Sequence, residues 1–184
     1  MDINALYDRW IPFVIENFTL VMFVLALIFF VFERLIQKIR RVEGGYVALF
    51  RWIALFPLAA TGFYVFTMQI FFQEMVAKGM GAEVSIFQFD AAAAFLTLGI
   101  VGLCSFCSSY GFRFATTLAA TTILWINSAY YLNMLSLDPN FQMVNVNSWV
   151  WLNFLTPLVM WICIGRMNSD ACNSAPKHKP AAEE

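Results

Sequence analysis

Asp90 is the side chain with the clearest chemical potential in this sequence. It ends a short polar and aromatic segment, residues 85–90 (SIFQFD), and stands directly before an apolar stretch. A carboxylate at a helix start accepts hydrogen bonds from free backbone N–H groups and is stabilised by the helix dipole. We interpret Asp90 as a helix N-cap. The alternative, compatible with it, makes Asp90 the acidic member of a ligand pocket.

The pocket hypothesis depends on polar side chains near the ends of neighbouring apolar stretches. Gln69 and Gln73 end one such stretch, and Asn133 ends another, so we expect them at the depth of Asp90. The residues that we expect to bind a small ligand are Asp90, Gln69, Gln88, Asn127 and Asn133.

A second candidate group is the pair Cys104 and Cys107, three residues apart near the end of the same apolar stretch. This spacing places two thiols on one helix face, and in a soluble redox protein it is typical of a dithiol. Free cysteine also behaves as a small hydrophobic side chain, so buried helix packing is the plainer interpretation. A soft-metal or quinone-linked thiol site is the alternative.

Several kinds of chemistry lack the necessary residues. The only histidine, His178, lies near the C-terminus, outside every apolar stretch, so no imidazole is expected to bind haem or zinc there. No phosphate-binding loop or zinc-protease motif is present. With a net charge of −1, nucleic acid is not expected as a partner. We expect no metal and no cofactor, and favour a protein that is not an enzyme.

The composition predicts a membrane protein. The chain has 184 residues, of which 61% are hydrophobic and 12% are charged, and its mean hydropathy is +0.70. Soluble domains carry about 25% charged residues, and a fold of this size could not bury so much apolar surface from water. The lipid bilayer is therefore the expected surrounding partner.

We expect an all-α fold, an integral membrane bundle of five transmembrane helices in one domain, residues 1–165. Residues 73–89 are expected to form a polar connection, residues 110–113 a tight turn and residues 166–184 a disordered tail. Pro57 is expected to bend the second span. The five spans are residues 11–32, 47–72, 91–109, 114–134 and 149–165.

The basic residues are sorted by side under this arrangement. Nine of the eleven Lys and Arg residues fall on one side, and only Arg9 and Lys78 on the other. Loops rich in Lys and Arg stay in the cytoplasm. We therefore expect a bacterial inner-membrane protein with its N-terminus outside and its C-terminus in the cytoplasm.

The fourth predicted span, residues 114–134, is unusually polar. Thr117, Thr121, Ser128 and Tyr131 follow helical spacing along one stripe. Hydrogen bonding to a neighbouring helix is the common role of such residues, and the third span is the expected partner because Gly99 and Gly102 permit close approach. A polar lining for a small ligand is the alternative.

Three segments together resemble a group of uncharacterised small bacterial integral membrane proteins: residues 51–72, 85–103 and 114–134. That group has a Ser-Pro-Phe-Gln-x-Glu motif, and this chain has Ile86 and Asp90 in place of its Pro and Glu. Gln69 and Asn133 stand where histidines would be expected. The resemblance implies fold and membrane location, and no activity.

Three functions remain open. The first is a non-enzymatic accessory subunit or small-ligand binder with an outward-facing polar pocket, which associates with a membrane-protein partner or with further copies of itself. The second is a small-solute transporter or permease, indicated by the polar fourth span. The third is a quinone-linked thiol oxidoreductase that uses Cys104 and Cys107.

Overall fold

The computed structural model describes residues 13–40, 44–79, 83–137 and 146–174. All regular structure in these ranges is helical. The helices are α2 (Phe18–Arg40), α3 (Gly45–Ile53), η1 (Ala54–Ala60), α4 (Thr61–Phe71), α5 (Gln73–Gly79), α6 (Phe87–Ser105), α7 (Tyr110–Leu137) and α8 (Val146–Ser174).

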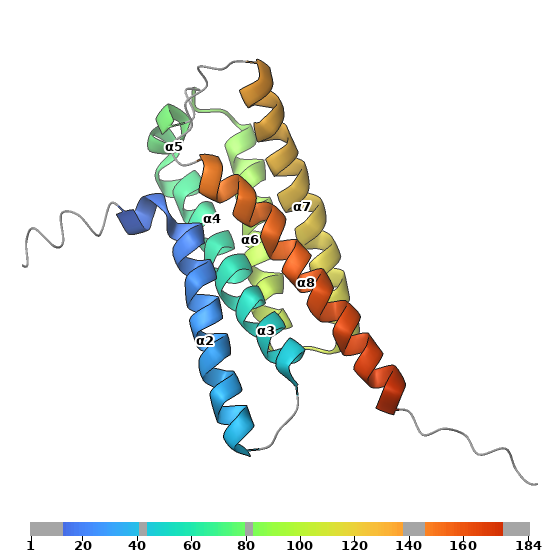
Figure 1. Ribbon diagram of the computed structural model, residues 1–184. Coiled ribbons are helices and arrows are strands. Elements are labelled where there is room, and N and C mark those ends of the chain that lie inside the picture. Colours follow the sequence, from blue (N-terminus) through green and yellow to red (C-terminus); the bar gives the residue numbers. More distant parts are fainter. Residues whose placement is uncertain (1–12, 41–43, 80–82, 138–145, 175–184) are drawn as a thin grey trace, which may run out of the picture.

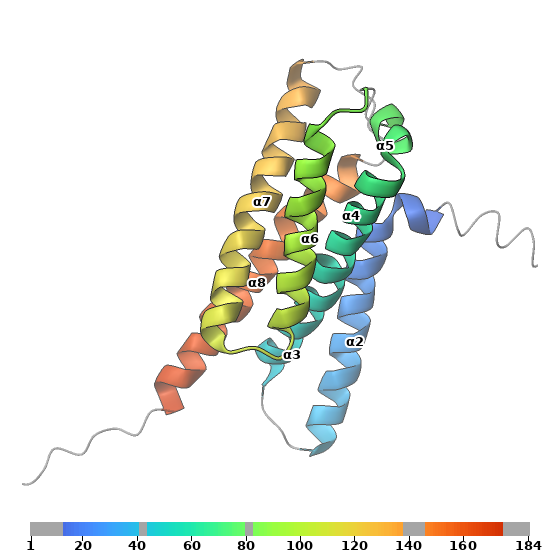
Figure 2. The ribbon, with the colours of Figure 1, turned by 180° about the vertical axis from the view of Figure 1, so that it is seen from behind.

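The long helices run up and down in chain order (Figures 1 and 2). Helices α3, η1 and α4 join into one continuous rod, which is antiparallel to α2 and to α6. The end at which α2 stops and α7 begins is called the basic end, because Arg34, Lys38, Arg51, Arg113 and Arg166 lie there. The opposite end carries α5 and is called the α5 end.

In the part of the chain that the structure describes, four helical stretches are long and apolar enough to cross a membrane. Helix α7 is as long as these but less apolar, and it is not one of the four. The predicted helical bundle is present, but the predicted count of five spans is not supported. The four stretches are Phe18–Lys38, Gly45–Phe71, Phe87–Ser105 and Ser148–Met167.

The structure differs from the predicted local structure at three places. Residues 110–113 are not a turn but the first turn of α7, and the chain reverses instead at residues 106–109. Part of the predicted polar connection forms α5. The predicted disordered tail is helical as far as Ser174, because no helix-breaking residue occurs between residue 166 and Pro176. Residues 175–184 lie outside the described part of the chain.

Pro57 lies where the rod of α3, η1 and α4 changes its helix type, while the bend predicted there stays a prediction. The proline lies inside η1, a π-helical segment of seven residues between α3 and α4. Proline lacks an N–H group, and its ring clashes with the carbonyl one turn earlier. Widening the helix to a π turn relieves that clash without ending the rod.

The closest helix contact joins α4 and η1 to α6. A Cβ atom on Gly62 would lie 2.7 Å from the backbone nitrogen of Gly99 and from the carbonyl oxygen of Phe95. A Cβ atom on Gly102 would lie 2.9 Å from the carbonyl oxygen of Ala54. The expectation that Gly99 and Gly102 approach the fourth span was wrong. These glycines lie against the rod formed by α3, η1 and α4.

The interior is built from two helix pairs. Helix α4 packs chiefly on α6, and α7 packs chiefly on α8, while α3 contacts α8 in the half near the basic end. Large apolar side chains fill that half, among them Phe50, Ile53, Leu98 and Met160, each under 2% exposed. Many large apolar side chains also face outward, as lipid contact would require.

We predict that Gly62→Ala destabilises the bundle, because the added methyl group meets backbone atoms that cannot move aside. The expected loss is about 1–3 kcal/mol of unfolding free energy, measured by thermal unfolding in detergent. Gly111→Ala is the matched control, since nothing lies within 4 Å of its Cβ position. Equal melting temperatures for Gly62→Ala and wild type would contradict the packing described.

Candidate functional site

Asp90 is not a helix N-cap. Helix α6 begins three residues earlier, at Phe87, and Asp90 lies in its first turn with an exposed side chain. Its carboxylate is still placed favourably against the helix dipole. The N-cap prediction was wrong because the helical pattern was counted from the first alanine and not from the aromatic segment before it.

The cap is supplied by Ser85 and Gln88. The Ser85 hydroxyl accepts from the backbone N–H of Phe87 at 3.3 Å, and the Gln88 side-chain oxygen accepts from the N–H of Ser85 at 3.4 Å. This pair follows the Ser-x-x-Gln pattern of a capping box, but it lies one residue before the N-cap position, Ile86, and the Ser85 hydroxyl meets the N–H of Phe87 and not that of Gln88. The Gln88 amide also donates to the carbonyl of Gln73 at 3.4 Å, which ties α6 to the start of α5.

The five predicted ligand-binding residues differ in their surroundings. Asp90 and Asn133 are exposed, and Gln88 is buried and bonded to Ser85. Asn127 is half-buried. Gln69 is half-buried too, and its side-chain oxygen is buried without a hydrogen-bond partner. Of the five, Gln69 alone offers a buried and unused hydrogen-bonding atom.

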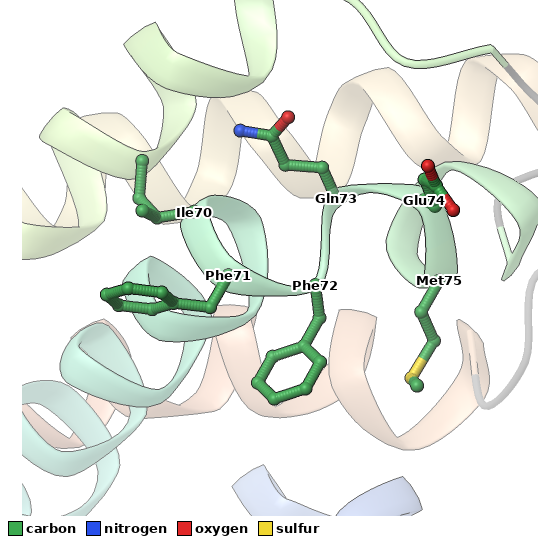
Figure 3. Close-up of a pocket in the computed structure, with 6 residues that line it drawn as sticks. All are labelled: Ile70, Phe71, Phe72, Gln73, Glu74 and Met75. Carbon is green, nitrogen blue, oxygen red and sulfur yellow. The ribbon is translucent and has the colours of Figure 1, made fainter.

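A shallow hollow lies where α4 meets α5 (Figure 3). Its volume is about 410 Å³, and it is lined by residues 70–75. Phe72 and Met75 point to one side of the chain, while Ile70 and Gln73 point to the other. Phe71 and Met75 are largely exposed. This hollow is open and contains none of the five predicted residues.

The hydroxyl groups of α7 are mostly used inside the bundle. Thr117, Thr121 and Thr122 each donate to the carbonyl one turn earlier on their own helix, at 2.7–3.0 Å. Thr121 also accepts from the indole N–H of Trp161 at 2.9 Å. Ser105 of α6 donates to Thr116 of α7 at 2.6 Å. One hydrogen bond thus joins the third and fourth predicted spans, but Thr116 makes it and not the predicted stripe, whose Thr121 bonds across to α8 instead.

Three polar atoms in the α5 half of the bundle are buried and have no hydrogen-bond partner. They are the side-chain oxygen of Gln69 on α4, the hydroxyl of Ser128 on α7 and the amide nitrogen of Asn153 on α8. Ser128 is 0% exposed and Asn153 is 3% exposed. We call these three residues the interior polar group.

The interior polar group lies at one depth. Ser128 and Asn153 fall between two contacts that join α7 to α8: Trp125 to the Phe154 carbonyl, and Tyr131 to Trp149.

On one side of Gln69, Gly62 contacts α6 at residues 95–99, and on the other side Gln73 is hydrogen-bonded to Gln88. Because the two chains are antiparallel, Gln69 lies at the same height as Ala92 of α6. Ala92 precedes Ser105 by thirteen residues on α6, and Ser128 follows Thr116 by twelve residues on α7. Because Ser105 and Thr116 are hydrogen-bonded, Ala92 and Ser128 both lie about 18–20 Å along the bundle from that bond.

A second polar cluster, which the sequence did not predict, lies at the basic end. Glu33 accepts from Arg51 at 3.3 Å and from the indole N–H of Trp52 at 2.5 Å, and the Gln37 amide donates to it at 3.1 Å. The Arg51 guanidinium lies 4.2 Å above the ring of Phe106. An arginine inside an apolar stretch needs a nearby acid, and Glu33 stands at the end of the preceding stretch.

The two cysteines of the predicted thiol pair are both exposed. Their interpretation as buried packing residues was wrong, because Cys104 lies on the outward face of α6 and Cys107 lies in the turn that follows this helix. Cys163 of α8 is buried instead. Among the residues whose side chains are described, no three His, Cys, Asp or Glu side chains come together as a metal site.

We predict that Glu33 and Arg51 are energetically coupled. Glu33→Gln and Arg51→Gln should each lower the unfolding free energy by about 1 kcal/mol, and the double variant should lose clearly less than the sum. The value is kept low because the two side chains are 20% and 31% exposed and water screens the pair.

Arg34→Gln is the control for this cycle, since Arg34 is exposed and bonds only to the Gln37 amide oxygen in the described structure. Strict additivity of the Glu33 and Arg51 variants would contradict the pairing.

Comparison with known proteins identifies one relationship. No curated protein and no solved structure matches the chain. One family model matches residues 16–171, which is most of the chain and includes every helix from α2 to α7. The resemblance to an uncharacterised family is thereby confirmed, over a wider range than the segments that suggested it. The chain belongs to the family of unknown function DUF6790.

Proposed function

We propose that the protein is a five-span protein of a bacterial inner membrane that holds a small neutral molecule at the interior polar group. In this proposal it is not an enzyme but a ligand-binding or accessory subunit. The observation that carries the proposal is the set of unpartnered buried atoms on Gln69, Ser128 and Asn153.

The fifth crossing in this proposal is α7. It packs on α6 and on α8, two helices that are apolar enough to cross, and it runs alongside them in both views (Figures 1 and 2). Its threonines are bonded within the bundle, which removes the main cost of placing a polar helix in lipid. The basic end then faces the cytoplasm, since Lys and Arg collect there.

The chemistry of the interior polar group favours an uncharged ligand. Gln69 offers an acceptor, Asn153 offers a donor, and the Ser128 hydroxyl can do either. Unsatisfied buried polar atoms cost about 1–3 kcal/mol each, so three at one depth are expected to be kept for a partner molecule. None of the three residues carries a charge, so an ion would find no counter-charge from them.

Transport is the second candidate function, favoured by η1. This π-helical segment lies within the continuous rod of α3, η1 and α4, and the hydroxyl of Thr61, directly after it, is also buried without a partner. Short π-helical segments inside α-helices are frequent at functional sites. A solute held at the interior polar group could pass toward Thr61 if the two helix pairs separate.

We predict that Ser128→Ala and Asn153→Leu stabilise the empty protein and abolish capture of the ligand. Removing an unsatisfied buried polar atom should raise the unfolding free energy by roughly 1 kcal/mol, because its desolvation cost disappears. The measurements are thermal unfolding in detergent and untargeted mass spectrometry of small molecules released from the purified protein.

Thr122→Ala is the control, because Thr122 is an exposed threonine of the same helix whose hydroxyl bonds to its own backbone. If Ser128→Ala and Asn153→Leu release the same molecules as wild type, the proposal fails. Proteoliposome flux of glycerol and urea then separates binding from transport: flux that Ser128→Ala abolishes supports a transporter, and its absence supports a binder.

A further inference from the structure

Arg113 is a buried cation without a carboxylate partner. It is 8% exposed and lies in the first turn of α7, at the basic end. Among the residues that the structure describes, the one ion pair is that of Arg51 with Glu33. A buried charge is costly unless it meets an opposite charge or a full set of hydrogen bonds.

The contacts of Arg113 are long and involve neutral groups. Its Nε donates to the carbonyl of Ser105 at 3.4 Å, and one terminal nitrogen donates to the carbonyl of Phe106 at 3.5 Å. The other terminal nitrogen has only the sulfur of Met167 at 3.7 Å. Good N–H···O bonds are about 2.7–3.2 Å long, so these contacts only partly compensate the charge.

A second cation lies beside this position. The ring of Phe106 lies under the Arg51 guanidinium at 4.2 Å, while the carbonyl of the same residue accepts from Arg113. Both guanidinium groups therefore contact the same residue, Phe106. Glu33 is already engaged by Arg51, Trp52 and Gln37, so it is not available to neutralise Arg113.

The wider surroundings add to the positive charge. Arg34, Lys38 and Arg166 lie at the same end, and Glu33 is the one acid there whose side chain the structure describes. Leu103, Tyr110 and Phe114, close to Arg113 in the chain, are exposed apolar or aromatic side chains. An anion bound here would have charged groups on one side and a lipid-facing apolar surface on the other.

We propose that Arg113 and Arg51 bind the phosphate of an anionic phospholipid at the basic end, with its acyl chains along the exposed apolar surface of α6 and α7. A phosphate oxygen supplies the charge-assisted hydrogen bonds that Arg113 lacks. Basic pockets between membrane helices on the cytoplasmic side are suited to such headgroups. The inference uses the membrane placement proposed above and is independent of the interior polar group.

The first test compares lipids on the wild-type protein. Added phosphatidylglycerol should raise the melting temperature in neutral detergent, while phosphatidylcholine should not. Sodium phosphate at the same concentration separates the two sources of the anion. If inorganic phosphate alone reproduces the whole shift, or if phosphatidylcholine gives an equal shift, the phospholipid assignment is overturned.

The second test uses variants, read by native mass spectrometry of bound phosphatidylglycerol. Arg113→Gln and Arg51→Gln should each reduce bound lipid roughly tenfold, because each removes a charge-assisted hydrogen bond. Arg34→Gln, an exposed cation of the same end, should change it little.

Arg113 could instead serve only to cap the last carbonyls of α6. In that case Arg113→Gln would lower stability in lipid-free detergent but keep the full shift on adding phosphatidylglycerol. That result would overturn the inference. If Arg113→Gln fails to fold, Arg51→Gln and the wild-type lipid comparison still decide it.

Discussion

The constraint on which this structure depends is that the apolar interior of the bundle offers no hydrogen bonds, so each polar group inside it needs a partner within the protein. Helix α7 shows how the chain meets it. Its threonine hydroxyls return to their own backbone, and Trp161 and Ser105 join α7 to the helices on either side. One terminal nitrogen of Arg51 meets the same requirement through Glu33. The groups left over include the interior polar group, the Thr61 hydroxyl, the Nε of Arg51 and Arg113, and these are the positions where an external molecule is most expected.

The close contact of Gly62 with Gly99 defines one of the two helix pairs of the bundle, α4 with α6. Because Gly62 lies directly against α6, α4 and α6 have little room between them and form one unit. Helices α7 and α8 form the other, held by aromatic contacts such as Tyr131 with Trp149. The half near the basic end is filled by large apolar side chains. The unpartnered atoms of the interior polar group lie in the other half, among buried apolar side chains such as Val150 and Leu152.

The apolar stretches of the sequence predicted the long helices, because these depend on local sequence. They could not predict which neighbour Gly99 approaches, since that depends on how the helices are arranged. The cap was missed although Ser85 and Gln88 carry a recognisable local signal. Glu33 was missed because its partner, Arg51, lies on another helix. For the site, the positions of polar residues in apolar stretches indicated Gln69, Asn127 and the stripe that contains Ser128. Asn153 is distinguished by its burial alone, which no single sequence displays.

The most direct test of this account asks whether α7 crosses the membrane. In a background with the other three cysteines replaced by serine, Cys107 marks the turn before α7, and Leu137→Cys in the same chain with Cys107→Ser marks its far end. Both positions are exposed. Labelling with a membrane-impermeant maleimide in intact and in opened cells should place them on opposite sides, with residue 137 outside. Labelling of both positions from the same side would contradict the account, because α7 could not then enclose an interior site.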